Sequence, residues 1–148
     1  MSYTYQYPRP SLTADCVVFS IVEGRVSVLL IRRANAPFKG QWAFPGGFLD
    51  MDETVEECAR RELREETGLD LGNLEQLKVF STVDRDPRGR TVTVAFVAVV
   101  GHVEVCGGDD AAEAAWFNIN DLPSPLAFDH DEIMLVAKDY LKAHGIEA

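Results

Sequence analysis

The chain has 148 residues, enough for a hydrophobic core of its own, and we expect residues 1–148 to form a single domain. Hydrophobic residues make up 47% and charged residues 26%, the balance of a globular protein, and no apolar run is long enough to cross a bilayer. The formal net charge of −10 argues against a nucleic-acid partner, because the phosphate backbone would be repelled.

The start of the chain and its cysteines indicate the compartment. Residues 1–10 are polar, aromatic and proline-bearing, and they lack the basic start and apolar middle of a signal peptide. The three cysteines, Cys16, Cys58 and Cys106, are far apart and odd in number, so they form neither a metal-binding spacing nor a disulfide framework. We therefore expect a cytoplasmic protein that works in a reducing environment.

Runs of β-branched and aromatic residues predict strands along most of the chain. The predicted strands are residues 14–22, 26–31, 77–83, 91–100 and 114–119. Glu23 and Gly24 are a turn signal, so we expect the first two strands to pair as a hairpin. Residues 35–47 contain two prolines and three glycines and are expected to be rich in loops.

Two segments are expected to be helical. In residues 54–67, Thr54 and Glu57 have the spacing of a capping box, and Gly68 follows where a left-handed cap would lie. A closing helix is predicted from His130 to His144. Its apolar stripe, which we expect to pack on the core, consists of Ile133, Val136, Ala137 and Leu141. Strands, a central helix, more strands and a final helix predict an α+β domain with a mixed sheet.

The first predicted helix gathers carboxylates on the face that should meet the rest of the protein. On a helical wheel, its apolar side is marked by Val55, Cys58, Ala59 and Leu63. Glu62 and Glu66 lie inside that arc, one turn apart, and Glu65 lies at its margin. Partly buried like charges are costly unless they are paired or bind a cation such as Mg²⁺. The alternative is a solvated acidic face that neighbouring arginines balance.

The sequence around these acids decides between the two interpretations. From Gly47 the chain runs five residues to Glu53, then seven more to residues 61–69, which read Arg-Glu-Leu-Arg-Glu-Glu-Thr-Gly-Leu. This pattern matches the Nudix box at every specified position, and residues 42–46 also resemble the family's approach to the box. The chain therefore resembles the Nudix hydrolases, and the resemblance implies their α/β/α sandwich with a mixed central sheet.

The resemblance also implies a divalent cation, Mg²⁺ with Mn²⁺ as the alternative. Its implied ligands are the carboxylates of Glu62 and Glu66, then Glu65, and the backbone carbonyl of Gly46. Gly46 and Gly47 suit this place because a backbone without Cβ atoms can approach a metal or phosphate closely. Both glycines equally fit a tight turn that enters the helix.

The reaction implied by the resemblance is attack of a metal-activated water on a phosphorus of a diphosphate. The general base is either Glu65 in the box or Glu113, which stands three residues before Trp116, where relatives often carry an acid. The alternative for Glu113 is an ordinary exposed loop acid. Arg61 either pairs with Glu53 to hold the loop or contacts the phosphate.

Residues farther along the chain bear on the substrate. The loop of residues 84–90 carries Arg85, Arg88 and Arg90, which can bind a phosphate or ribose hydroxyls, or form a solvated hairpin tip. Phe128 and the N-terminal tyrosines are candidates for stacking on adenine, with core or dimer packing as the alternative. Residues 84–90, 108–110 and 126–130 together resemble the ADP-ribose pyrophosphatase branch, which produces AMP and ribose 5-phosphate.

Two other functions stay open. The first is a nucleoside triphosphate pyrophosphohydrolase, whose distinguishing residues are scattered. The second is a non-enzymatic sensor that binds ADP-ribose and regulates transcription through a winged helix. The complete set of box acids and the end of the chain soon after its last predicted helix favour an enzyme. The resemblance further implies a homodimer whose partner is a small-molecule nucleoside diphosphate, with no nucleic acid and no membrane.

Overall fold

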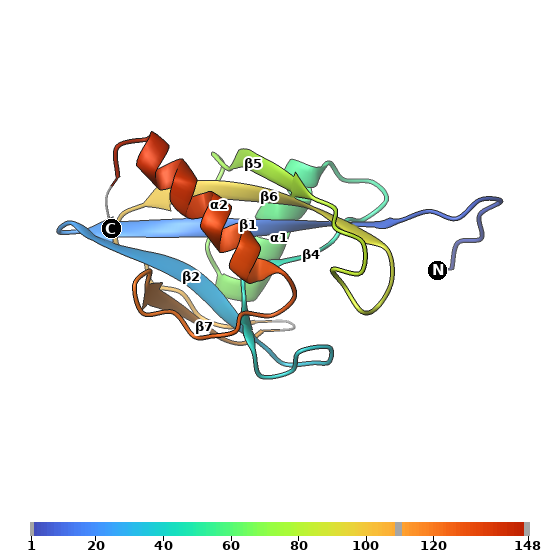
Figure 1. The fold of residues 1–148 in the computed structure, drawn as a ribbon, viewed down its shortest axis with the longest axis horizontal. Coiled ribbons are helices and arrows are strands. Elements are labelled where there is room, and N and C mark those ends of the chain that lie inside the picture. The colour runs from blue at the N-terminus through green and yellow to red at the C-terminus, as the bar shows by residue number, and fades with distance from the viewer. Residues whose placement is uncertain (1, 109–110, 147–148) are drawn as a thin grey trace.

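A mixed sheet with one helix on each face forms the body of the protein (Figure 1). The computed structural model describes residues 2–108 and 111–146, so Asp109 and Asp110 of the predicted substrate pattern lie outside the described residues. The strands are β1 (Ser11–Val22), β2 (Arg25–Arg33), β3 (Trp42–Ala43), β4 (Gly46–Phe48), β5 (Glu75–Phe80), β6 (Thr91–Val100) and β7 (Ala111–Asn118). The helices are α1 (Val55–Thr67) and α2 (His130–Ala143). The predicted α/β/α sandwich is confirmed.

The strand pairing leaves an opening beside the first half of β1. The order is β3-β2-β1-β6-β5, with β4 also paired to β1 and β7 to β2. β1 and β6 run parallel, whereas β1 and β2 form the predicted antiparallel hairpin over residues 19–22 and 25–28. Beyond the hairpin the two strands separate, because β4 pairs with β1 at residues 13–15 and β3 pairs with β2 at residues 31–32.

Alternation along β1 divides the core into two layers. Successive side chains of a strand point to opposite faces of the sheet. Val17 and Phe19 pack in the layer that contains α2, and Cys16 and Val18 pack in the layer that contains α1. Asp15 has the same parity as Val17, so this acid lies on the face that α2 covers.

Helix α1 begins and ends at the predicted caps. The Thr54 hydroxyl accepts a hydrogen bond from the Glu57 amide at 3.1 Å, and the Glu57 carboxylate accepts one from the Thr54 amide at 2.9 Å. Gly68 closes the helix with a φ of 77° and donates its amide to the Arg64 carbonyl. The buried side of α1 is formed by Cys58, Ala59, Leu63, Glu66 and Thr67. An acid on the apolar face, as the helical wheel predicts, is therefore confirmed.

Helix α2 packs its predicted stripe on the sheet. Its buried residues are His130, Ile133, Met134, Ala137 and Leu141, and Val136 is partly buried against the same core. Asp129 occupies the N-cap position without making a side-chain cap hydrogen bond. In the part of the chain that the structure describes, neither helix combines the length and apolarity needed to cross a bilayer.

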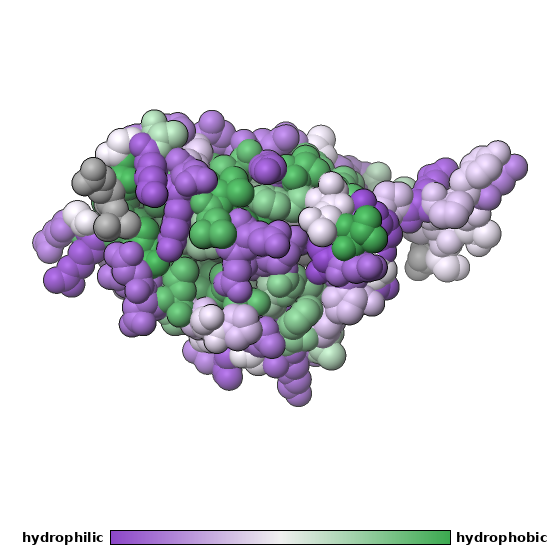
Figure 2. All heavy atoms as spheres, viewed as in Figure 1, coloured by the Kyte–Doolittle hydropathy of each residue, from purple (hydrophilic) through white to green (hydrophobic). Residues whose placement is uncertain are grey.

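The segment before β1 projects from the body of the protein (Figures 1 and 2). Tyr3, Tyr5 and Tyr7 on this segment are all exposed. Tyr3 stacks on Tyr5 with 6.3 Å between ring centroids, and the Arg9 guanidinium lies 4.0 Å from the centre of the Tyr5 ring. Tyr3, Tyr5 and Tyr7 do not line the cavity that opens between β1 and β2, so their proposed contact with adenine finds no support.

The capping box gives a test of the fold. We expect Thr54→Ala to lower the free energy of unfolding by about 1 kcal/mol, because the amide of Glu57 loses its acceptor at the helix start. Thr54→Ser keeps the hydroxyl and serves as the matched control. Urea denaturation followed by circular dichroism measures both variants. Equal stability of Thr54→Ala and Thr54→Ser would contradict the capping role.

Candidate active site

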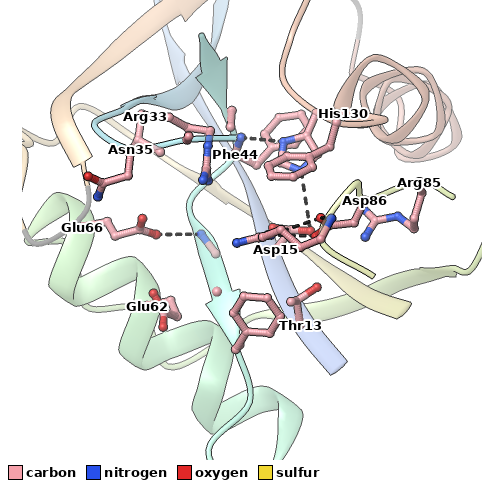
Figure 3. A pocket seen from close by; sticks show the side chains of 18 of the residues that line it. Thr13, Asp15, Arg33, Asn35, Phe44, Glu62, Glu66, Arg85, Asp86 and His130 are labelled. Carbon is pink, nitrogen blue, oxygen red and sulfur yellow. Dashed lines mark hydrogen bonds and ion pairs between the residues drawn. The ribbon is translucent and has the colours of Figure 1, made fainter. Parts of the chain in front are cut away.

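A cavity of about 370 Å³ opens where β1 and β2 separate (Figure 3). Its walls come from β1, β2, the segment that joins β3 to β4, helix α1, the loop before β6 and the start of α2. Most of these elements are distant in sequence, so the cavity is a product of the sheet topology. Acidic and basic side chains line it together, and this mixture suits a ligand that carries both charges and hydroxyl groups.

The acids of α1 meet the glycine pair at one wall of the cavity. Glu62 and Glu66 both line it, and Glu66 is buried with 4% of its surface exposed. The Gly46 amide donates a hydrogen bond to Oε1 of Glu66 at 2.7 Å. A Cβ atom on Gly47 would overlap the carboxylate of Glu62, and one on Gly46 would overlap Asp15. Glycine is required here by close approach, as the sequence predicts.

Arg61 binds the acids that surround it. It forms a bidentate pair with Glu53, with distances of 2.9 Å from Nε and 2.7 Å from Nη2. Its Nη1 atom lies 2.8 Å from Glu62 and 3.1 Å from Glu65, and its Nη2 atom donates to the Phe48 carbonyl. The hydrogen bonds from Arg61 lower the pKa of Glu53 from 4.5 to about 2. The predicted pairing of Arg61 with Glu53 is confirmed, whereas a contact with phosphate stays a prediction.

The donors at this wall are hard oxygen atoms, which fit Mg²⁺ or Mn²⁺ better than a softer metal. One oxygen of Glu66 is already fixed by a backbone amide, as is common for carboxylates that bind metals. Across residues 2–108 and 111–146, no three acidic, histidine or cysteine side chains form a ready metal cage. Mg²⁺ does not require one, because it usually combines one or two carboxylates with waters and substrate phosphates. The ligand set stays a prediction.

The opposite wall holds a chain of buried polar groups that the sequence analysis missed. The Thr93 hydroxyl donates to Oδ2 of Asp15 at 2.7 Å, and Nε2 of His130 lies 3.7 Å from the same oxygen. The Phe44 amide donates to Nδ1 of His130 at 3.0 Å. Burial lowers the pKa of His130, which favours a neutral imidazole. The available signal was Asp15, a charged residue inside a long apolar strand.

The arginine loop before β6 is only partly directed at the cavity. Arg85 lines the cavity, but its side chain is nearly buried and forms a bidentate pair with Asp129 at 2.8 and 2.6 Å. That pair explains why Asp129 does not cap α2. Arg90 is exposed, donates to the Thr82 carbonyl at 3.4 Å and lies outside the described cavity lining. Of the three arginines, Arg85 and Arg88 reach the cavity.

Phe128 lines the cavity and lies among planar groups. Its ring centroid lies 4.8 Å from that of Phe38, and the guanidinium groups of Arg33 and Arg88 lie 4.9 and 5.3 Å from it. Arg88 also lies 4.7 Å from the ring centroid of Phe48. Phe128 has a positive φ of 52°, a costly backbone conformation for a residue other than glycine. Because Phe128 lines the cavity, contact with a ligand is possible there, and its stacking on adenine stays a prediction.

The two candidate bases do not line the cavity in the described structure. Glu65 lies on α1 and forms an ion pair with Arg61. Glu113 lies on β7 opposite Arg32 of β2, and the two side chains form an ion pair of 2.8 Å with both partners about half exposed. The sheet register therefore directs Glu113 to Arg32, and its role as a base finds no support in this arrangement.

Known proteins resemble this chain over most of its length. The model of the NUDIX domain family matches residues 10–136. An ADP-ribose pyrophosphatase of Methanocaldococcus jannaschii is 46% identical over 136 residues, which are 92% of this chain and 76% of that protein. The ADPR responsive transcriptional repressor NtrR of Acinetobacter baylyi is 39% identical over 132 residues. The match covers 86% of this chain but only 53% of the repressor.

Solved structures agree with these sequence relatives. A MutT/nudix family protein from Enterococcus faecalis superposes with a TM-score of 0.88 and 36% identity, over 96% of this chain and 66% of that one. The NUDIX domain of Shewanella oneidensis NrtR, solved in complex with ADP ribose, gives a TM-score of 0.85 and 34% identity. That match covers 91% of this chain and 90% of the domain.

The pair of Arg61 and Glu53 predicts a pH-dependent stability. Because the folded-state pKa of Glu53 is about 2 and its ordinary value is 4.5, the ionised carboxylate stabilises the fold above pH 4.5. This contribution is lost as the pH falls toward 2. We expect Glu53→Gln to be less stable than wild type at pH 7, with a gap that narrows below pH 4.5. Urea denaturation between pH 3 and 7 measures the gap, and a constant gap would contradict the assignment.

Proposed function

The chain belongs to the Nudix family, and on that premise we propose that it hydrolyses the pyrophosphate bond of ADP-ribose to AMP and ribose 5-phosphate. The observation that carries this proposal is the meeting of Glu62 and Glu66 with Gly46 and Gly47 in one cavity. The choice of ADP-ribose rests on the 46% identity to a pyrophosphatase named for it and on the relative solved with that ligand.

Nudix hydrolases generally need divalent cations, and we assign Mg²⁺ to Glu62, Glu66 and the carbonyl of Gly46. When bound, the cation lowers the pKa of a water molecule and offsets negative charge on the phosphate oxygens. Hydrogen bonds hold both proposed carboxylate ligands in place before a cation binds. The Gly46 amide fixes one oxygen of Glu66, and Arg61 fixes one oxygen of Glu62, so less side-chain entropy is lost on binding.

The other side of the cavity provides contacts for the nucleoside and sugar. Arg88 pairs with the buried carboxylate of Asp86 at 2.8 Å, and its side chain, which is 40% exposed, has further donors for a phosphate or a hydroxyl group. Phe128 also lines the cavity, and adenine would stack on its ring in place of one of the guanidinium groups that lie over it. Arg85 has a different part in this proposal: its pair with Asp129 holds the loop before β6 against the start of α2.

Removing one metal ligand tests the assignment of the cation site. We expect Glu66→Gln to keep the fold and to lower kcat by about 100-fold or more, because the neutral amide binds a hard cation poorly. A coupled assay of AMP release from ADP-ribose measures kcat, and circular dichroism checks the fold. A variant with nearly the wild-type rate would show that Glu66 is not a ligand.

The general base has two candidates, neither of which lines the cavity, and we assign the role to Glu65 because it shares the Nη1 atom of Arg61 with the proposed ligand Glu62. General-base catalysis contributes on the order of 10²–10⁴ in rate, so Glu65→Gln should lower kcat by about 100-fold or more. Glu113→Gln, which breaks only the exposed pair with Arg32, is the control and should stay within about twofold of wild type. A large loss in Glu113→Gln alone would move the base to β7.

A sensor of ADP-ribose is the second candidate, and the 39% identity to an ADPR responsive repressor favours it. A substrate panel with Mg²⁺ separates the possibilities: ADP-ribose, NADH, dinucleoside polyphosphates and nucleoside triphosphates. Turnover of ADP-ribose supports the pyrophosphatase, and tight binding without turnover supports the sensor. Preferred turnover of triphosphates would indicate a nucleoside triphosphate pyrophosphohydrolase.

We also propose that the protein forms a homodimer, and light scattering measures its mass in solution.

A further inference from the structure

Residues 44–46 lead from β3 into β4 at the cavity wall, and each is anchored to a different element. The Phe44 amide donates to Nδ1 of His130 on α2 at 3.0 Å. The Pro45 carbonyl accepts from the amide of Cys16 on β1 at 2.8 Å. The Gly46 amide donates to Glu66 on α1 at 2.7 Å. The segment that would present the Gly46 carbonyl to a cation is thus fixed by three hydrogen bonds, one of them to a histidine side chain.

The hydrogen bond from Phe44 specifies the protonation of His130. A backbone amide can only donate, so Nδ1 must lack a proton and act as the acceptor. The neutral ring then carries its proton on Nε2, which points toward Oδ2 of Asp15 at 3.7 Å (Figure 3). Asp15 accepts from Thr93 at 2.7 Å and so has an anchor of its own on β6. These contacts define both the tautomer and the orientation of the ring.

Packing alone does not require a histidine at this position. The His130 ring stacks on Phe44 with centroids 5.2 Å apart and an interplanar angle of 26°, a contact that a phenylalanine could also make. A phenylalanine could not accept the Phe44 amide, which would then stay buried without an acceptor. The polar function of His130 is therefore directed at the backbone of this segment.

We propose that His130 is a positioning residue for the cation site. By accepting the Phe44 amide it fixes the position of the backbone of residues 44–46, and thereby the position of the Gly46 carbonyl. This inference rests on the proposed function, because it presumes that Gly46, Glu62 and Glu66 hold the cation. His130 lines the cavity, but both nitrogens of its ring face protein groups, Phe44 on one side and Asp15 on the other. It acts through the backbone, as groups outside the ligand set of metal sites commonly do.

The test is a titration with MnCl₂ in the absence of substrate, with free Mn²⁺ measured by electron paramagnetic resonance. His130→Phe keeps the ring and removes the acceptor, and we expect it to weaken Mn²⁺ binding by about tenfold or more. His130→Asn places an amide oxygen where Nδ1 was, so it should recover binding to within about threefold of wild type. His144→Phe, on the exposed end of the same helix, should bind Mn²⁺ as wild type does.

Including Glu66→Gln in the same titration separates the two proposals. If Glu66→Gln binds Mn²⁺ as well as wild type does, the cation site itself is wrong, and the role of His130 is wrong with it. If Glu66→Gln loses Mn²⁺ while His130→Phe retains it, only the positioning role is wrong. Equal weakening in His130→Phe and His130→Asn would also overturn that role, because the acceptor would not matter.

A measurement on the wild-type protein covers the case in which His130→Phe fails to fold. Long-range ¹H–¹⁵N correlation spectra distinguish a bare ring nitrogen from a protonated one. We expect His130 to carry its proton on Nε2 and to show a bare, hydrogen-bonded Nδ1. A proton on Nδ1 would overturn the proposal, because that nitrogen could not then accept the Phe44 amide.

Discussion

The site depends on how closely a backbone without side chains approaches buried carboxylates. Gly46 and Gly47 lie between Asp15 of β1 and the acids of α1, so near that a Cβ atom would overlap either neighbour. This approach brings the Gly46 amide within hydrogen-bonding distance of Glu66. A buried carboxylate without such a donor would cost several kcal/mol. The glycine pair therefore allows acids to be buried beside the cavity, and Arg61 supplies the compensating charge for the acids on its own side.

Features that are local in sequence could be predicted, because their physics is local. The caps of α1 depend on Thr54, Glu57 and Gly68, which lie within one or two turns of the bonds they make. The pairing of Arg61 with Glu53 spans eight residues along the box and was also foreseen. The long strands were found from their apolar runs, whereas β3 and β4 were not. Strands of two and three residues exist only because β2 and β1 pair with them, and no periodicity marks them.

The wall that carries Asp15 could not be assembled from the sequence, because its parts come from distant places. Asp15 and Thr93 are 78 residues apart, and Phe44 and His130 are 86 apart. The same reason explains Arg85, which the sequence offered as a ligand for substrate. Its partner Asp129 lies 44 residues farther on and is brought beside it only by the fold. Glu113 was predicted to lie at the site, but the register of β7 on β2 places it opposite Arg32, which is its partner.

Several locally unfavourable features meet around the cavity. Asp129 gives up the cap of α2, a loss of about 1 kcal/mol, in order to bind Arg85. Phe128 adopts a left-handed backbone that costs about 1–2 kcal/mol, and it lies next to that same aspartate. Departures from local preference that gather in one place are typical of functional sites, where the surrounding structure holds strained residues in position. Because His130 follows Asp129 directly, the start of α2 holds the arginine loop through Asp129 and anchors residues 44–46 through His130. A shift of this helix end would therefore move both the arginine loop and residues 44–46.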